Sequence, residues 1–354
     1  MNDWILKFQI KGTPVHYSRY GCGHINETYL VTCDSGINYI LQKINKNIFK
    51  QPEELMENVS AVTTYLAEHC EDPRASLHLV PGVDGKSFYQ DANEEYWRMY
   101  EFVYSTVCLQ KAETPKDFYY SGLAFGKFQG ELAGFPAQTL HEAIKDFHNT
   151  RARFDQLHAA MEVNFENRKA QCAKELEFAL ARECEGGIIV DKLANGELPL
   201  RVTHNDTKLN NVLFDYDTRT PLCVIDLDTI MPGSSLYDYG DSIRFGASTA
   251  AEDEQDLDKV WCDMDLFRTY TEGFLEGCGG RLTQKEVEML PVGAKMMTLE
   301  CGIRFLADYL NGDTYFRTHY PQQNLDRART QFKLVADMEA KWEQMHNIVK
   351  ETVK

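Results

Sequence analysis

The sequence predicts an α+β protein with a small antiparallel, β-rich N-terminal lobe and a larger, mainly helical C-terminal lobe. Residues 14–44 alternate apolar and polar side chains between turn residues, which predicts three short antiparallel strands. From residue 115 onward, apolar residues recur mostly at helical spacing. We expect the boundary near residue 104, which gives an N-terminal lobe of residues 1–104 and a C-terminal lobe of residues 105–354.

The elements follow in order. A helix is expected from Pro52 to about Glu68, because its apolar residues are three or four positions apart. Two further strands are expected around residues 78–80 and 97–103. The helices expected in the C-terminal lobe cover residues 118–132, 153–182, 257–276, 286–310 and 324 to the end.

Composition excludes several classes of protein. The 354 residues carry a net charge of −17, which disfavours nucleic acid and anionic membranes as partners. The chain begins without the features of a signal peptide, and no apolar run approaches the ~20 residues of a membrane span. The ten cysteines include no C-x-x-C pair, which favours free thiols in a reducing compartment. We therefore expect a cytoplasmic protein.

The most informative segment is residues 202–228. It predicts a short strand, a polar loop, a second strand, a turn at residues 216–221 and a third strand that ends in an aspartate. The loop has the spacing H-x-D-x-x-x-x-N at His204, Asp206 and Asn211, and Asp226 follows fifteen residues later. A kinase-type phosphoryl-transfer site needs these residue types in this order.

Each residue of this segment has a predicted role. Asp206 would accept or orient the attacking hydroxyl, although a loop aspartate taken by itself is more typical of a turn cap. Asn211 and Asp226 offer hard oxygen ligands for magnesium. Asp228 either holds a second metal ion or solvates the loop, and Lys208 either neutralises the γ-phosphate or is a solvated surface lysine. We expect His204 to brace the loop.

Two other groups of polar residues favour structural roles. Asp238, Asp241 and Arg244 are interpreted as an internal ion-pair cluster that braces the site. His141 and His148 are seven positions apart on a predicted helix, and we interpret them as surface residues because nothing near them resembles a metal site.

The N-terminal lobe has its own candidates for nucleotide binding. Gly21 and Gly23 are typical of a hairpin turn, and they are also placed to lay backbone amides over phosphates as a kinase glycine-rich loop does. No G-x-x-x-x-G-K-[ST] motif is present, which disfavours a P-loop protein. Gln42 stands where a kinase keeps its phosphate-binding lysine. Lys43 is next to it, but strand alternation directs it to the opposite face unless a bulge intervenes.

These motifs resemble the aminoglycoside phosphotransferase/choline kinase superfamily, which are small-molecule kinases with a protein-kinase-like fold. Within it, the chain looks closest to the bacterial N-acetylhexosamine 1-kinases. The resemblance extends over nearly all 354 residues. It is densest at residues 23–26, 202–211, 225–234, 240–248 and 304–310.

The resemblance implies ATP-dependent phosphorylation of the anomeric hydroxyl of N-acetylglucosamine or N-acetylgalactosamine, with magnesium. It implies that Asp206 is the base, that Asn211 and Asp226 bind magnesium, and that the Glu101–Val103 backbone is the adenine hinge. The neutral Gln42 departs from the usual cation of the superfamily. The residues implied to contact the sugar are His24, Phe245, Arg304 and Tyr315.

Three alternatives stay open. The acceptor of a kinase in this superfamily can be another alcohol, such as choline, homoserine or an aminoglycoside. A nucleotide-binding scaffold without catalysis is favoured by Gln42 alone. Finally, Asp226-Leu-Asp228-Thr229 is similar to the nucleophile motif of haloacid-dehalogenase-type phosphohydrolases, although its threonine comes one position early.

Overall fold

The computed structural model describes residues 4–21, 25–110 and 112–353, which form two compact units. The first unit takes residues 1–109, 131–145 and 211–232, and the second takes residues 110–130, 146–210 and 233–354. The segment 211–232 thus belongs with the N-terminal sheet, although it lies in the middle of the sequence.

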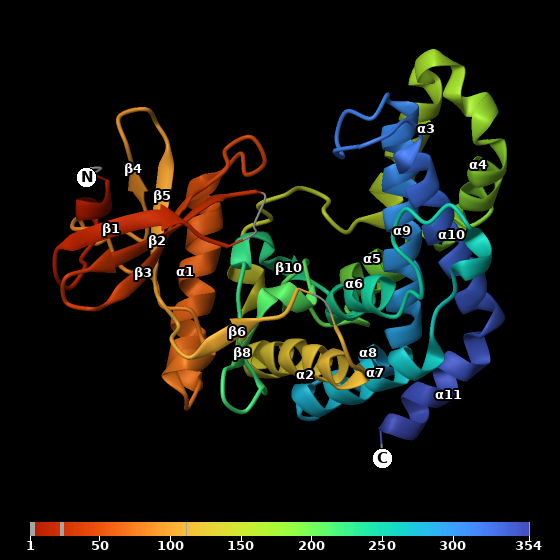
Figure 1. The fold of residues 1–354 in the computed structure, drawn as a ribbon. Helices are drawn as coiled ribbons and strands as arrows, with labels where there is room; N and C mark the ends of the chain where they lie inside the picture. The colour runs from red at the N-terminus through yellow and green to blue at the C-terminus, as the bar shows by residue number, and fades with distance from the viewer. Residues whose placement is uncertain (1–3, 22–24, 111, 354) are drawn as a thin grey trace. The chain divides into compact units, whose positions relative to one another are not determined.

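Five antiparallel strands form the main sheet of the first unit, in the order β1-β2-β3-β5-β4 (Figure 1). β1 (Pro14–Arg19), β2 (Glu27–Cys33) and β3 (Asn38–Lys43) confirm the three strands predicted for residues 14–44. β5 spans Tyr96–Glu101, and the short edge strand β4 (Tyr89–Gln90) was not predicted. The prediction of a strand at residues 78–80 is wrong. This segment forms only a single β-bridge, between Leu79 and Tyr100, because Pro81 has no N–H with which to continue the ladder.

Side-chain alternation gives this sheet two different faces. On one face, Leu41 and Met99 are buried against the N-terminal residues Ile5 and Phe8. The other face faces helix α1 (Pro52–His69), which confirms the helix predicted there and buries its regularly spaced apolar residues. The face toward α1 carries polar side chains, which matter for the site.

A second, three-stranded sheet completes the first unit. β8 (Val212–Asp215) and β9 (Pro221–Val224) form a hairpin, and β6 (Thr106–Cys108) pairs with the outer side of β8. The hairpin confirms the strand–turn–strand pattern predicted for residues 212–226. Its end carries Asn211 and Asp226.

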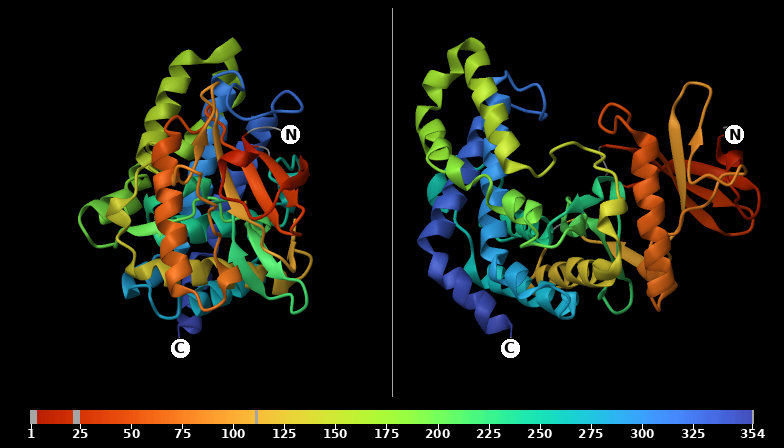
Figure 2. Two further views of the ribbon diagram at one scale, coloured as in Figure 1. Left: turned by 90° about the vertical axis from the view of Figure 1, so that its left-hand side faces the viewer. Right: turned by 180° about the vertical axis from the view of Figure 1, so that it is seen from behind.

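The second unit is mainly helical (Figure 2). Its short strand β7 (Arg201–Thr203) leads into the polar loop, as predicted. Its helices are α2 (Pro115–Glu131), α3 (Thr150–Val163), α4 (Ala173–Leu180), α5 (Ile188–Ala194), α6 (Ser235–Gly246), α7 (Met264–Cys278), α8 (Gln284–Glu288), α9 (Leu290–Leu310), α10 (Gln323–Ala340) and α11 (Trp342–Thr352).

The structure divides three of the predicted helices. The helix predicted from residue 324 to the end is interrupted at Lys341, between α10 and α11. Residues 153–182 are not one helix, because Asn164 adopts a left-handed conformation with φ of 42° that ends α3. The helix predicted over residues 286–310 is interrupted at Met289, just before Pro291 in the first turn of α9. Proline has no N–H to donate to the preceding turn, so it begins a helix more readily than it continues one.

Helices α2 and α7 approach closely enough to require glycine at their contact. A Cβ atom on Gly126 would lie 2.1 Å from the carbonyl oxygen of Phe274, and one on Gly273 would lie 2.1 Å from that of Tyr119. Both distances are far below van der Waals contact. Helix α2 also contacts β7, the strand that leads into the polar loop. Gln129 of α2 donates a hydrogen bond to the Val202 carbonyl at 2.9 Å.

Two general features complete the fold. Among the described residues, no helix is long and apolar enough to cross a membrane. The nine cysteines that the structure describes are free thiols, and five of them are buried.

A buried ion pair fixes β7, the strand that enters the polar loop. Arg201 donates from Nε and Nη2 to the two carboxylate oxygens of Glu286, at 2.9 and 2.7 Å. Glu286 is 1% exposed and also accepts from the hydroxyl of Ser235 at the start of α6, at 2.8 Å. One carboxylate thus connects β7, α6 and α8.

We expect the substitution Arg201→Met to lower the free energy of unfolding by about 3–5 kcal/mol, because it leaves the Glu286 carboxylate buried without a cation. Urea unfolding followed by circular dichroism measures the change. The control is Arg151→Met, which breaks the exposed pair of Arg151 and Asp191 and should have a far smaller effect. Equal losses in the two variants would contradict the assignment.

Candidate active site

The polar loop after β7 is held by α6 within the second unit. The backbone N–H groups of His204 and Asn205 donate to the two carboxylate oxygens of Asp238, at 2.9 and 2.8 Å, and Gln129 donates to the same carboxylate at 2.7 Å. Asn205 has a positive φ of 65°, which costs a non-glycine residue free energy unless neighbouring bonds impose it. Asp238 supplies those bonds.

His204 braces the loop from the other side. Its side chain is fully buried, with its ring 5.4 Å from the ring of Phe125 and 5.9 Å from that of Phe128, both on α2. The N–H of Asp206 lies 3.3 Å from His204 Nδ1. This arrangement agrees with the bracing role predicted for His204.

Asp206 and Lys208 lie together at the partly exposed end of this loop. Lys208 Nζ is 2.7 Å from Asp206 Oδ1. Burial alone would lower the pKa of the Lys208 ammonium, but the Asp206 carboxylate outweighs this effect and the pKa is raised. Lys208 is therefore a cation bound to the candidate base, not an isolated surface lysine.

The predicted ion pair on α6 is present and connects to this cluster. Arg244 Nη2 lies 2.9 Å from Asp241 Oδ1, and both residues are buried. Asp241 also accepts from the Thr207 N–H at 3.3 Å. Burial would raise the pKa of Asp241, but Arg244 and Lys208 lower it further than burial raises it. The carboxylate is thus ionised beneath the loop.

Asn211 and Asp226 lie at the same end of the β8–β9 hairpin in the first unit. Val212 pairs with Val224, and the N–H of Ile225 donates to the Asn211 carbonyl at 2.9 Å. Asp226 follows at once, in a left-handed conformation with φ of 61°. Two strained residues, Asn205 and Asp226, therefore occur at the two segments for which the sequence predicts chemistry.

These two side chains fit a magnesium ion that arrives with a nucleotide. Among the described residues, no group of three or more His, Cys, Asp or Glu side chains is arranged to hold a metal ion. Magnesium bound to phosphates, however, keeps its waters and needs only one or two protein oxygen ligands. Asn211 and Asp226, adjacent across the end of the hairpin, provide that number.

One of the two predictions for Asp228 was that it solvates its loop, and this prediction is wrong. Its side chain is buried, forms an ion pair with Arg98 Nη1 and accepts from Asn26 Nδ2. Asn26 in turn accepts from the N–H of Asn45 at 2.9 Å. The role of Asp228 as a second metal ligand stays a prediction.

Arg98 is the residue that sequence reasoning missed. It lies on β5 directly opposite Gln42 of β3 and is 1% exposed. Its Nε donates to Gln42 Oε1 at 2.9 Å. The available signal was one arginine within the apolar run of residues 96–100. As predicted from alternation, Lys43 lies on the opposite face, 3.5 Å from Glu95, because β3 pairs without a bulge.

The remaining nucleotide candidates are only partly described. Gly21 has a positive φ of 76°, as expected of a turn glycine. Gly23 and His24 lie outside the described residues. Glu101 is the last residue of β5 and Val103 lies two residues on, where its carbonyl accepts from the Thr106 hydroxyl at 3.0 Å.

The residues expected to bind the acceptor lie in the second unit. Phe245, at the end of α6, and Tyr315, beyond α9, are 53% and 71% exposed. Arg304 of α9 lies over the rings of Phe147 and Phe316, at 5.7 and 5.5 Å. The Asp308 carboxylate accepts from the N–H groups of residues 314–316 at 2.8–3.0 Å, and this fixes the segment that carries Tyr315.

His148 is not the helical surface residue that we predicted. It precedes α3 and is buried, with Nδ1 2.9 Å from Glu300 Oε1, while the Thr150 hydroxyl donates to Glu300 Oε2 at 2.8 Å. His148 Nε2 is buried without a hydrogen-bond partner among the described residues. The pKa of Glu300 is lowered, because His148, Arg153 and Arg304 together outweigh the effect of burial.

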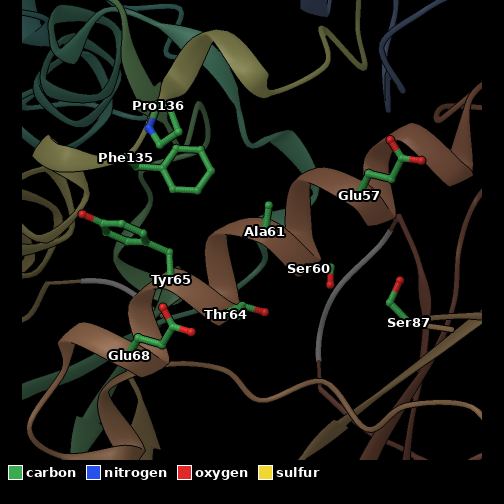
Figure 3. Close-up of a pocket in the computed structure, with 9 residues that line it drawn as sticks. All are labelled: Glu57, Ser60, Ala61, Thr64, Tyr65, Glu68, Ser87, Phe135 and Pro136. Carbon is green, nitrogen blue, oxygen red and sulfur yellow. The ribbon is translucent and has the colours of Figure 1, made fainter. Parts of the chain in front are cut away.

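A separate pocket of about 580 Å³ runs along α1 in the first unit (Figure 3). The carboxylates of Glu57 and Glu68 lie along it, with the rings of Tyr65 and Phe135 (Figure 3). The described residues that line it include no lysine, arginine or histidine. A triphosphate there would meet carboxylates without a cation, so this pocket is not the candidate nucleotide site.

Several solved structures are similar to this chain over most of its length. The chain is similar to a microcompartment-associated aminopropanol kinase (16% identity, 97% of this chain and 96% of that chain covered, TM-score 0.59). It is similar to an aminoglycoside phosphotransferase from Alicyclobacillus acidocaldarius (12% identity, 98% and 95% covered, TM-score 0.64). It is also similar to an amicoumacin kinase in complex with AMP-PNP and Ca²⁺ (12% identity, 93% and 90% covered, TM-score 0.60).

At these identities the solved structures show a common kinase-like fold. The family model described as the phosphotransferase enzyme family matches residues 16–268, which include β7, the polar loop and both residues at the end of the hairpin. The chain belongs to the phosphotransferase enzyme family.

Proposed function

We propose that this protein is an ATP-dependent sugar kinase that phosphorylates the anomeric hydroxyl of an N-acetylhexosamine. Membership of the phosphotransferase family supports transfer of a phosphoryl group to an alcohol. The choice of the C1 hydroxyl rests on the resemblance of the sequence motifs to N-acetylhexosamine 1-kinases. The choice of a neutral acceptor rests on the residues around Arg304.

One observation carries the preference for a neutral acceptor. Arg304 has no hydrogen-bond or ion-pair partner among the described residues, and its guanidinium group is framed by Phe147 and Phe316. The nearby Glu300 carboxylate is already bound by His148 and Thr150. A cationic acceptor such as an amino alcohol needs aromatic rings with free carboxylates, whereas a pyranose presents apolar faces and oxygen-rich edges.

His148 adds an unpaired ring nitrogen to this lining. Its Nδ1 lies 2.9 Å from Glu300 Oε1, whereas its buried Nε2 has no hydrogen-bond partner among the described residues. An unpaired buried nitrogen gains free energy when it forms a hydrogen bond with a ligand hydroxyl. We assign Nε2 to a sugar hydroxyl.

In the proposed reaction, Asp206 orients the acceptor hydroxyl and takes its proton. The acceptor oxygen forms a bond to the γ-phosphorus while the bond from that phosphorus to the β-bridging oxygen breaks, and ADP leaves. Lys208, bound to Asp206, supplies positive charge for the transferred phosphoryl group. Asn211 and Asp226 would hold a magnesium ion, which neutralises the phosphates when it is bound.

The first test replaces the candidate base. Asp206→Asn keeps the shape of the side chain but removes its ability to take a proton, so sugar-dependent ADP formation should fall by about 10²–10⁴-fold with Mg-ATP affinity retained. Asp217→Asn, on the exposed turn of the hairpin, is the matched control and should keep full activity. Activity of Asp206→Asn within tenfold of the parent would rule out this role.

The second test addresses metal ligation. Asp226→Ala should weaken magnesium-dependent binding of ATP by about tenfold or more, because a charged ligand to the ion is lost. Isothermal titration of ATP with and without magnesium separates this effect from nucleotide affinity itself. Asp217→Ala serves as the control. Unchanged Mg-ATP affinity in Asp226→Ala would remove the metal assignment.

The third test concerns the acceptor. A panel of N-acetylhexosamines, choline, homoserine, aminopropanol and an aminoglycoside, with ATP and magnesium, should give a phosphate ester only at C1 of the N-acetylhexosamines. Arg304→Met should then raise the KM for the sugar by roughly 10–100-fold, because hydrogen bonds from a charged group are lost. The exposed Arg268→Met is the control. Phosphorylation of an amino alcohol alone would overturn the proposed acceptor.

A further inference from the structure

The first unit contains a buried cation next to the position where a kinase-like site keeps its lysine. Gln42 stands at that position on β3, and its cross-strand partner on β5 is Arg98. A guanidinium group buried in a sheet is costly unless it is paired. Arg98 is paired with the buried Asp228, which in turn accepts from Asn26. Two polar side chains, Asp228 and Asn26, therefore hold one positive charge at this place.

The chemistry of arginine fixes the orientation of the Gln42 amide. A guanidinium group has donors and no acceptor, so Gln42 must present its oxygen to Arg98 Nε. Its amide nitrogen then faces the other way and donates one hydrogen to the Thr28 hydroxyl, at 3.1 Å. The second hydrogen of that nitrogen has no acceptor among the described residues. Gln42 therefore offers an oriented donor, backed by a positive charge.

The same cation interacts with the candidate metal ligand. Burial would lower the pKa of Arg98, but the carboxylates of Asp228 and Asp226 are among the groups that raise it further than burial lowers it. Arg98 thus offsets the two negative charges that lie two residues apart after β9. Without it, the phosphates of a nucleotide would meet both carboxylates with only the metal ion to balance them.

We propose that Gln42 and Arg98 act as a pair in place of the missing lysine, with Gln42 donating to a nucleotide phosphate and Arg98 as its positioning residue. This inference rests on the proposed kinase function. Asp228 and Asn26 anchor Arg98, so Asp228 serves the charge balance of the site and not a second metal ion. Lys43 takes no part, because it lies on the opposite face with Glu95.

The decisive variant is Gln42→Glu. Glutamate keeps the shape of the side chain and accepts from Arg98 even better, but it has no N–H to offer a phosphate. Affinity for Mg-ATP, measured by titration calorimetry, should fall by about 10–100-fold, with adenosine affinity and thermal stability unchanged or higher. Gln90→Glu adds the same charge on the exposed strand β4 and should leave Mg-ATP affinity unchanged. Parent-like Mg-ATP affinity in Gln42→Glu would overturn the proposal.

A second set of variants removes the positive charge from Arg98 and then places one at position 42. The double variant Arg98→Met with Asp228→Asn removes both buried charges together, which avoids an unpaired ion. Its Mg-ATP affinity should fall by about tenfold or more while adenosine affinity stays the same. Adding Gln42→Lys to it restores a cation on β3 and should recover the lost affinity. A triple variant no better than the double one would show that Arg98 acts only in folding, against the proposal.

These measurements are separable from a failure of the proposed function. Nucleotide binding is read without an acceptor, so a parent chain that phosphorylates no N-acetylhexosamine can still show the expected loss and recovery. That outcome would overturn the sugar kinase proposal and support the role of Arg98. If instead the parent phosphorylates an N-acetylhexosamine and Gln42→Glu leaves its Mg-ATP affinity unchanged, the sugar kinase proposal stands and the role of Gln42 and Arg98 is overturned.

Discussion

The buried ion pair between Arg98 and Asp228 is the interaction on which the site of the first unit depends. It joins the middle of the main sheet to the segment after the β8–β9 hairpin, two elements far apart in the sequence. Removing one partner of such a pair typically costs about 3–5 kcal/mol, because the other charge stays buried. The pair thus fixes the segment directly after Asp226, which lies two residues before Asp228 in a left-handed conformation at φ 61°. A structural pair therefore lies two residues from a residue for which we propose metal binding.

In the second unit, too, a buried carboxylate lies next to a residue with a strained backbone. Asn205 is strained, and the buried carboxylate of Asp238 accepts two backbone N–H groups that impose its conformation. Asp206 follows Asn205 directly and is partly exposed, and it does not take part in these bonds to Asp238. In both units the carboxylate that stabilises the local structure is a buried one, and it is not the carboxylate for which we propose chemistry. The acidic residues of the motifs therefore divide into buried ones that hold the loops, Asp228 and Asp238, and more exposed ones for which we propose chemistry, Asp206 and Asp226.

Local patterns in the sequence predicted much of this arrangement, and distant pairings account for what they missed. Alternation and helical spacing act over a few residues, so they identified β1, β2, β3, β5, the β8–β9 hairpin, α1 and the polar loop, but not the short strands β4 and β6. The role of Arg98 depends on β5 lying beside β3 in a register that places it opposite Gln42, and one sequence does not reveal that pairing. His148 was misplaced for a similar reason, because its partner Glu300 comes from a helix far along the chain. The catalytic and metal roles of Asp206, Asn211 and Asp226 remain predictions from spacing.

The environment of Arg98 also weighs on the two alternatives that the sequence left open. An inactive nucleotide-binding scaffold was favoured by Gln42 alone, as the missing cation of the site. The cation is present one strand away, so that argument loses its basis. A phosphohydrolase with Asp226 as nucleophile would need a second carboxylate to pass a proton to the leaving group. Asp228 is the nearest candidate in the sequence, but it is buried, paired with Arg98 and bonded to Asn26, so its carboxylate is already engaged. The Arg98–Asp228 pair thus occupies the carboxylate on which hydrolysis through Asp226 would depend.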